Sequence, residues 1–192
     1  MFKTLRNAFQ IADIRKRIAY TFMMLVVVRL GSLLPAPGVD SAVVKDLFNN
    51  MNSAFNILNA FTGGSFQQMS IFALSISPYI TSSIIVQLLT IAIPKLEEMQ
   101  KDGEEGKKKM AAITRYTTVA LAVIQSVAMG IGFGNQGLFG GDKATFVQVA
   151  MFALTLTAGS SFLMWAGERI TEKGIGNGIS MILLFNHLKV TH

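Results

Sequence analysis

The chain has 192 residues, of which 51% are hydrophobic and only 15% are charged, and its mean hydropathy is +0.47. Because a soluble domain carries about 25% charged residues, this composition argues against an ordinary globular protein. The many Phe, Met, Ile and Leu residues argue equally against a disordered chain. The sequence contains no Cys, which excludes a disulfide scaffold, thiolate zinc and iron–sulfur sites, and a cysteine nucleophile.

The charged residues are clustered and leave long uncharged stretches between them. No Asp, Glu, Lys or Arg occurs in the 48 residues from 47 to 94, and residues 116–141 and 144–167 are also uncharged. A helix needs about 20 apolar residues to cross a bilayer. We therefore predict four membrane spans, over residues 18–34, 70–93, 116–133 and 145–166. The first contains Arg29, which either extends its side chain to the outer interface or makes a polar contact inside the protein.

The basic residues lie on alternate sides of the predicted spans. Thirteen occur before the first span, between the second and third, and after the fourth: Lys3, Arg6, Arg15, Lys16, Arg17, Lys95, Lys101, Lys107, Lys108, Lys109, Arg115, Arg169 and Lys173. The opposite connections hold only Lys45 and Lys143. The positive-inside rule therefore predicts a cytoplasmic N-terminus. The net charge of +6 is then a topology signal, and nucleic-acid binding is not needed to explain it.

The segments outside the spans have distinct compositions. Residues 1–17 mix apolar and basic side chains, which is typical of an amphipathic helix lying on the inner leaflet. Residues 95–115 hold eleven charges, so we predict a solvated, partly helical cytoplasmic loop. Residues 174–192 begin with alternate glycines followed by a short apolar run, and we interpret them as the start of a truncated fifth span.

Residues 49–68 form an unusual segment, because they carry no charge but are interrupted by five Asn residues and by Gly63-Gly64. The segment is too short and too polar to span a membrane, and too apolar for a typical exposed loop. Backbone that does not span is tolerated at membrane depth only where protein or a water-filled cavity surrounds it. A short re-entrant helix is therefore favoured over an external amphipathic helix.

Two polar features mark the second predicted span. Pro78 removes one helical hydrogen bond, and the Ser and Thr residues around it can satisfy the freed backbone groups, so we predict a kinked helix. Gln87 is the only amide of this span. It must face another helix or water, because burying it unpaired is costly.

The motifs of common enzymes and metal sites are missing from the sequence. There is no His-Glu-x-x-His, no Walker loop and no pair of intramembrane carboxylates, and both His residues lie in the polar tail. The glycines at 174, 176 and 178 follow no predicted strand, so they indicate a tight turn into a helix rather than a dinucleotide-binding loop. We predict no catalytic residue, no metal site and no cofactor. The alternative is a transporter or intramembrane enzyme with a re-entrant loop, but this would need midplane ionisable residues, for which only Arg29 qualifies.

Three long motifs resemble the SecY family of protein-translocase channel subunits. Residues 28–40 (VRLGSLLPAPGVD) resemble the end of its first span, residues 71–89 (IFALSISPYITSSIIVQLL) its second span, and residues 165–180 (WAGERITEKGIGNGIS) the junction into its fifth. The motifs occur in family order, and the similarity extends to about residue 185. The resemblance implies an all-α integral membrane protein: a multi-span helical bundle with a re-entrant plug helix, corresponding to the N-terminal half of the SecY channel fold.

The resemblance also implies roles for individual residues. The plug, which closes the resting pore from outside, matches residues 54–68, including Ala54, Phe55, Ile57, Leu58, Phe61, Gly63 and Gly64. The pore ring, an apolar constriction around the translocating chain, matches Ile76, Ile80, Ile179 and Leu183. The lateral gate, of which the second and third spans form one side, matches Gln87 and Thr81. Packing of Gln87 against a neighbouring span remains the alternative.

The implied function is that of the pore-forming subunit of a protein-conducting channel, which translocates unfolded secretory proteins across the bacterial plasma membrane and inserts membrane proteins into it. The implied partners are SecE and SecG subunits, the SecA motor ATPase, the ribosome, signal sequences, nascent chains and membrane lipid. Such a channel performs no bond chemistry, so we do not expect an enzyme. Because the family has ten spans in two halves, we expect this chain to be a fragment.

Overall fold

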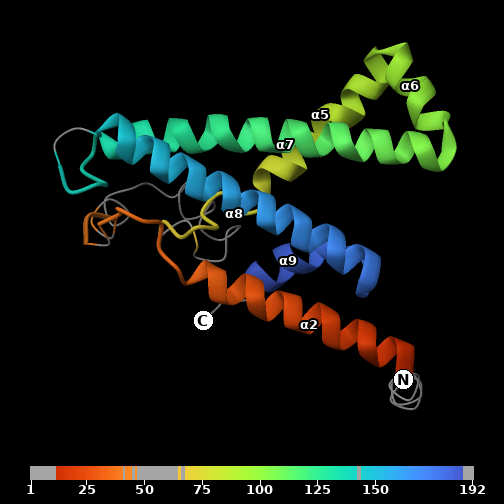
Figure 1. The fold of residues 1–192 in the computed structure, drawn as a ribbon, viewed down its shortest axis with the longest axis horizontal. Helices are drawn as coiled ribbons and strands as arrows, with labels where there is room; N and C mark the ends of the chain where they lie inside the picture. The colour runs from red at the N-terminus through yellow and green to blue at the C-terminus, as the bar shows by residue number, and fades with distance from the viewer. Residues whose placement is uncertain are drawn as a thin grey trace.

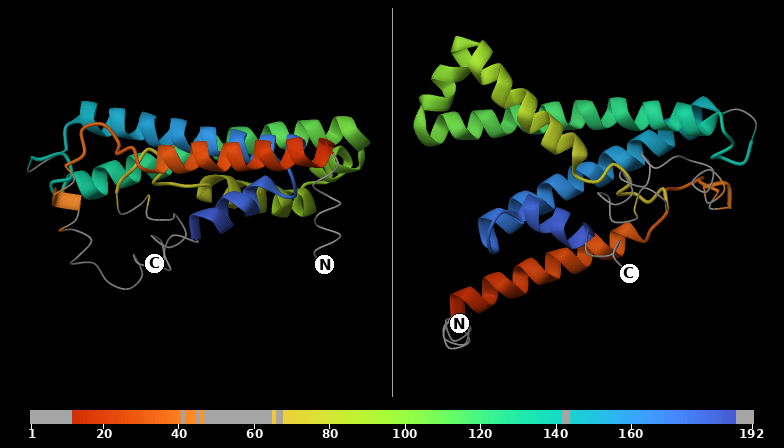
Figure 2. Two further views of the ribbon diagram at one scale, coloured as in Figure 1. Left: turned by 90° about the horizontal axis from the view of Figure 1, so that it is seen from below. Right: turned by 180° about the vertical axis from the view of Figure 1, so that it is seen from behind.

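The computed structural model describes residues 12–40, 42–44, 46, 65, 68–141 and 144–187. The named helices of this part of the chain are α2 (Ala12–Ser32), α5 (Ser77–Ala92), α6 (Pro94–Lys101), α7 (Gly103–Gly134), α8 (Phe146–Lys173) and α9 (Gly178–His187). Helix α8 is central: it packs against α7 on one side and against α2 and α9 on the other (Figure 1). Figure 2 shows from two further sides that α9 lies beside both α8 and α2.

Two of these helices, α7 and α8, are each long and apolar enough to cross a membrane, and α5 with α6 would make a third span if the bent pair is counted as one. Of the predicted spans, residues 116–133 fall inside α7, and residues 145–166 fall inside α8 apart from Thr145, which caps its start. Helix α2 contains residues 18–32 of the first predicted span, but it also includes the charged turn from Asp13 to Arg17. By length and composition alone, the described helices therefore support fewer than the four predicted spans.

Three charged helix ends lie toward the same side of the molecule, on the right of Figure 1. Helices α2 and α7 begin there and α8 ends there. Nη1 of Arg17 donates to the backbone carbonyl of Gly174 at 3.5 Å, and Arg115 pairs with Glu168. Basic segments that are far apart in the sequence thus lie toward one side of the molecule.

Helix α5 begins at Ser77, seven residues after the start of the span predicted over residues 70–93. The predicted kink at Pro78 is wrong, because this proline lies in the first turn, where its missing N–H would have no helical partner in any case. The chain bends instead by 105° between α5 and α6. The cause is Pro94, since the residue before a proline is driven out of the helical region, and Ile93 has φ −117° and ψ 109°.

The predicted loop over residues 95–115 is more helical than expected. It consists of α6 and the first turns of α7, joined at Asp102. Glu97 and Lys101 pair within α6 at 2.6 Å, and Glu105 and Lys109 pair within α7 at 3.9 Å. Pairs four residues apart stabilise a helix, which explains why a segment rich in both charges does not stay irregular.

Residues 69–76 form a non-helical segment that leads into α5. Met69 and Ser75 have positive φ angles of 44° and 51°, and both are buried. The segment is fastened to the end of the first helix region, since the amide of Ala36 donates to the carbonyl of Met69 at 2.9 Å and that of Ile71 to Leu34 at 3.0 Å. These bonds satisfy backbone groups that a helix would otherwise satisfy internally, as buried irregular backbone requires.

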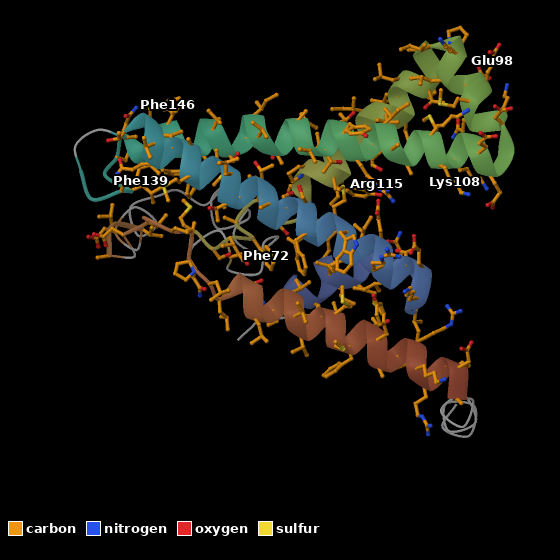
Figure 3. All side chains as sticks on the ribbon, viewed as in Figure 1. Phe72, Glu98, Lys108, Arg115, Phe139 and Phe146 are labelled. Atoms are coloured by element: carbon orange, nitrogen blue, oxygen red, sulfur yellow. The ribbon has the colours of Figure 1, made fainter. Side chains whose placement is uncertain are left out.

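Two glycines make room for this segment between α2 and α8. A Cβ on Gly31 of α2 would lie 2.7 Å from Cζ of Phe72, and one on Gly159 of α8 would lie 2.8 Å from the carbonyl carbon of Ile71. Phe72 is buried between them and stacks on Phe162 of α8 at a centroid distance of 5.8 Å (Figure 3). The position of residues 71–76 is therefore set by close contact with both helices.

The replacement Gly159→Ala should destabilise the protein by about 1–3 kcal/mol, because the new methyl group meets rigid backbone at Ile71. Gly132 of α7 is the matched control: it is also a helical glycine, but a Cβ there has no neighbour within 4 Å. Gly132→Ala should be neutral or stabilising through helix propensity. Thermal unfolding in detergent measures both, and equal effects at the two positions would contradict the packing argument.

Candidate functional site

The four residues predicted to form a ring converge in one apolar cluster. Ile76 is fully buried within it, and Ile80, Ile179 and Leu183 are partly buried and pack against it. The cluster joins α2, the segment before α5, α8 and α9; its other buried members are Met24, Leu25, Val28, Phe72, Leu163, Ala166, Ile170 and Ile182. Two segments about 100 residues apart in the sequence thus contribute branched apolar side chains to the same place.

Gly167 of α8 is the point at which these two segments meet. A Cβ on Gly167 would lie 3.1 Å from Cγ1 of Ile179 and 3.6 Å from Cδ1 of Ile76. A Cβ on Gly178 would collide with the carbonyl oxygen of Gly167. The backbones of α8 and α9 therefore approach more closely than residues with side chains would allow, and this closeness brings Ile179 beside Ile76.

The glycine-rich motif forms the turn between α8 and α9. Gly174 ends α8, Gly176 has a φ of +69°, and Gly178 begins α9. Oδ1 of Asn177 accepts from the amide of Ile179 at 3.0 Å, which satisfies one of the free donors at the start of the helix. The interpretation of these glycines as a tight turn into a helix is confirmed.

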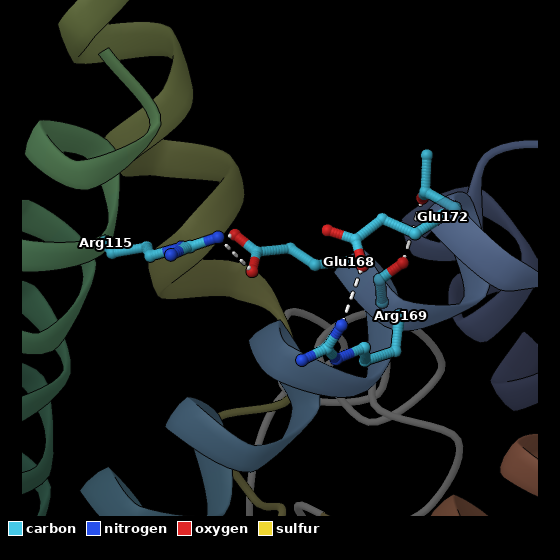
Figure 4. A network of polar contacts seen from close by, with 6 residues as sticks. Arg115, Glu168, Arg169 and Glu172 are labelled. Carbon is cyan, nitrogen blue, oxygen red and sulfur yellow. Dashed lines mark hydrogen bonds and ion pairs between the residues drawn. The ribbon is translucent and has the colours of Figure 1, made fainter. Parts of the chain in front are cut away.

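A group of charged side chains lies next to this cluster at the charged end of the molecule (Figure 4). Nε and Nη2 of Arg115 on α7 each lie 2.9 Å from one carboxylate oxygen of Glu168 on α8. Arg169 donates to Glu172 at 2.9 Å in the same helix, and its guanidinium carbon lies 5.8 Å from the ring centre of Trp165. The two-pronged contact of Arg115 with Glu168 is the one that joins two helices, and it has the geometry that makes such pairs strong.

The two predicted gate residues, Gln87 and Thr81, are both exposed on α5. Gln87 lines a groove of about 200 Å³ between α5, α6 and α7, together with Gln100 and Lys107. This position keeps the amide in polar surroundings, as its cost of burial requires. Neither residue belongs to the apolar cluster that contains Ile76.

The predicted plug and Arg29 remain to be placed. The predicted plug residues Ala54, Phe55, Ile57, Leu58, Phe61, Gly63 and Gly64 lie outside the described part of the chain. Arg29 is partly buried, and its Nη1 atom is enclosed without a hydrogen-bond partner among the described residues.

Comparison with known proteins identifies the family. The SecY family model matches residues 70–190. The chain is 46% identical over 187 residues to the protein translocase subunit SecY of Halalkalibacterium halodurans, covering 95% of this chain and 42% of that protein. The chain belongs to the SecY family. The SecY subunits of Bacillus subtilis and Pseudomonas aeruginosa are 44% and 42% identical, with 95% and 90% of this chain covered.

This SecY-family chain spans about two fifths of the length of the curated relatives it matches, since it covers 42% of two of them and 39% of the third. Two solved structures share its fold: a Sec61 in a canine ribosome-channel complex from the endoplasmic reticulum, and a protein-conducting channel. Each is 19% identical with a TM-score of 0.67, covering 90% of this chain and 36% of the solved chain. The protein is therefore an all-α, multi-pass membrane protein, and its relatives are named as translocase subunits rather than enzymes.

Sequence reasoning missed two features beside this apolar cluster: the close approach at Gly167 and the pair of Arg115 with Glu168. Gly167 stands in the family motif of residues 165–180 and at the end of an uncharged stretch, but a glycine within a span has no distinctive spacing that would predict a close helix contact. Arg115 and Glu168 are 53 residues apart, so no helical periodicity connects them. A weak signal did exist: both stand at the boundary between a charged segment and an uncharged one.

The pair of Arg115 with Glu168 should contribute a coupling free energy of about 0.5–1 kcal/mol, because Arg115 is half-exposed and solvent screens the attraction. A double-mutant cycle with Arg115→Ala and Glu168→Ala, followed by unfolding in detergent, measures it. The pair Arg169 with Glu172 is the control, since it lies within one helix and should give about 0.2–0.5 kcal/mol. Zero coupling for the first pair at low salt would show that the contact does not hold α7 to α8.

Proposed function

We propose that this chain is the N-terminal part of the pore-forming subunit of a protein-conducting channel. The channel translocates unfolded secretory proteins across the bacterial plasma membrane and inserts membrane proteins into it. Family membership supports the general activity, since the relatives are named protein translocase subunits. The observation that carries the proposal in this chain is the convergence of Ile76, Ile80, Ile179 and Leu183 in one apolar cluster.

In this proposal, the four residues form part of a pore ring that closes around the translocating polypeptide. Branched apolar side chains offer no ligands to an ion and disfavour water when the pore is empty. They also tolerate any passing sequence, because their contacts are non-directional. Ile76 caps the start of α5, and its carbonyl accepts from the amide of Ile80 at 3.1 Å. Ile179 and Leu183 are likewise four residues apart, within α9. Each pair therefore shares one helical face.

The other functional regions follow the family pattern. Residues 54–68 serve as the plug that closes the resting pore from outside. Helices α5 and α7 form one wall of a lateral gate, with Gln87 and Thr81 on it, through which signal sequences and nascent membrane helices reach the lipid. Exposure of both side chains on α5 supports this, since the residues of a gate wall must be accessible.

The proposed location is the bacterial plasma membrane, with the N-terminus in the cytoplasm. The N-terminal ends of α2 and α7 and the C-terminal end of α8 lie toward the same side of the molecule in Figure 1, and this supports the orientation, because basic residues gather on the cytoplasmic side. The proposed partners are SecE and SecG, the SecA ATPase and the ribosome. A neighbour in fold is itself a channel in a ribosome-channel complex, which favours the ribosome among them.

Crosslinking tests contact between the ring and a substrate. In a complete SecY-family subunit that carries this sequence, photo-reactive residues at 80, 179 and 183 should crosslink to a stalled secretory chain. Leu154 of α8 is the control, since it is 70% exposed and lies away from the cluster. Crosslinks at Leu154 but at none of the three ring positions would overturn the ring assignment.

Ion leak through the resting channel tests the seal. The double replacement Ile76→Gly with Ile80→Gly should raise the leak severalfold in proteoliposomes, because it removes two branched side chains that exclude water and ions. Replacing Leu89, which is 40% exposed on α5, by Gly provides a control on the opposite face of the same helix, since it lies nine residues after Ile80 and each helical residue turns by about 100°. A leak unchanged by the ring replacements would exclude a gasket at these positions.

A further inference from the structure

Helix α9 carries two of the proposed ring residues, Ile179 and Leu183, but it is only ten residues long. Its position depends on the turn of residues 174–177 that connects it to α8. This turn is held from two directions. One anchor comes from α8 itself, where Oγ1 of Thr171 accepts from the amide of Gly178 at 2.9 Å and donates to the carbonyl of Gly167 at 2.9 Å.

The second anchor is Thr21, which comes from α2 and is 154 residues away from its partner in the turn. Oγ1 of Thr21 accepts from the amide of Ile175 at 3.1 Å. The same hydroxyl donates to the carbonyl of Arg17 at 2.9 Å, one turn earlier in α2. The side chain is buried, with 5% of its surface exposed.

The hydroxyl of Thr21 also limits what the turn can contain. A Cβ on Gly174 would collide with this oxygen, so the turn lies directly against α2. Nη1 of Arg17 reaches the carbonyl of Gly174 at 3.5 Å from the same face of α2. Arg17 thus contacts the carbonyl oxygen of Gly174, and Thr21, one helical turn later in α2, contacts the amide of Ile175.

We propose that Thr21 is a positioning residue for the pore ring. Its hydroxyl fixes the turn before α9 and thereby the position of Ile179 along α8, beside Ile76. The inference rests on the proposed function, because it concerns the seal that the ring makes. The geometry links the two, since Ile179 and Ile76 both lie against Gly167, and Gly178 contacts the carbonyl of that glycine. A displaced turn would shift Ile179 along α8 and open the contact.

A hydroxyl can donate once and accept twice. Two replacements of Thr21 therefore distinguish the effect of its hydroxyl from that of its methyl group. Thr21→Val keeps the size of the side chain but leaves the amide of Ile175 without its acceptor. Thr21→Ser keeps the hydroxyl and loses only a methyl group. If the hydrogen bond positions the turn, Val should be the harmful change; if the methyl packing matters, Ser should be.

The experiment measures ion leak in proteoliposomes containing a complete SecY-family subunit that carries this sequence, with the amount of folded protein measured in parallel. Thr21→Val should raise the leak per folded channel about tenfold, which corresponds to the loss of one buried hydrogen bond of about 1.4 kcal/mol. Thr21→Ser should restore the parental leak. Thr118→Val is the matched control, because the buried hydroxyl of Thr118 donates to the carbonyl of Thr114 within α7.

An unchanged leak in Thr21→Val, together with a raised leak in the Ile76→Gly and Ile80→Gly variant, would overturn the role of Thr21 and leave the proposed function intact. An equal leak in the Ser and Val variants would overturn it as well. No leak in the ring variant would overturn the seal and this inference with it. If the Val variant does not accumulate, Thr21→Cys replaces it, since a thiol is only a weak hydrogen-bond donor and acceptor. An ion leak of the Cys variant equal to that of the parental channel would contradict the proposal.

Discussion

Close backbone contact along one face of α8 is the constraint on which the rest of the structure depends. Non-helical backbone inside a membrane protein must be covered by protein, because lipid offers its polar groups no partner. Gly159 admits the segment that leads into α5, and Gly167 admits the first turn of α9. A Cβ at Gly159 would meet the backbone of Ile71, and one at Gly167 would crowd the side chain of Ile179. The two pairs of proposed ring residues, one on each segment, meet because the same helix receives both.

The ion pair of Arg115 with Glu168 lies next to the close contact at Gly167. Glu168 follows Gly167 directly, so the side chain that pairs with Arg115 leaves the helix next to the residue that contacts Ile76 and Ile179. A half-exposed ion pair adds little free energy. Its two-pronged geometry nevertheless restricts the rotation of α7 relative to α8. The pair therefore contributes more to the specificity of the contact between α7 and α8 than to the stability of the fold.

Local patterns in the sequence predicted what local physics determines. Residues 116–133 and 145–166 lack charge, and they lie in the two helices that qualify as membrane spans. The alternate glycines after Lys173 indicated a turn into a helix, because positive φ and close approach both favour glycine. The family motifs extended this to the ring, whose residues the structure brings into one cluster. Family membership was also predictable, since three motifs in order are unlike any chance arrangement.

Features that depend on distant partners were beyond the same reasoning. Pro78 was expected to kink a longer helix, but the preceding residues pair with Leu34 and Ala36 instead and leave the proline at the helix start. Nothing near Pro78 in the sequence encodes that pairing. The loop of residues 95–115 was judged by its charge, although opposite charges four residues apart also favour a helix. Thr21 was unremarkable for a similar reason, because its partner in the turn lies 154 residues away.

The four proposed ring residues are not equivalent, and their difference follows from the same packing. Ile76 is fully enclosed and lies against α8 at Gly167, so its side chain has little room to move. Ile80, Ile179 and Leu183 are only partly buried and keep free apolar surface at the edge of the cluster. A ring must both hold its position and yield to side chains of different sizes. One enclosed residue supporting three partly free ones meets both demands, because close packing resists deformation while side chains at its edge can change rotamer.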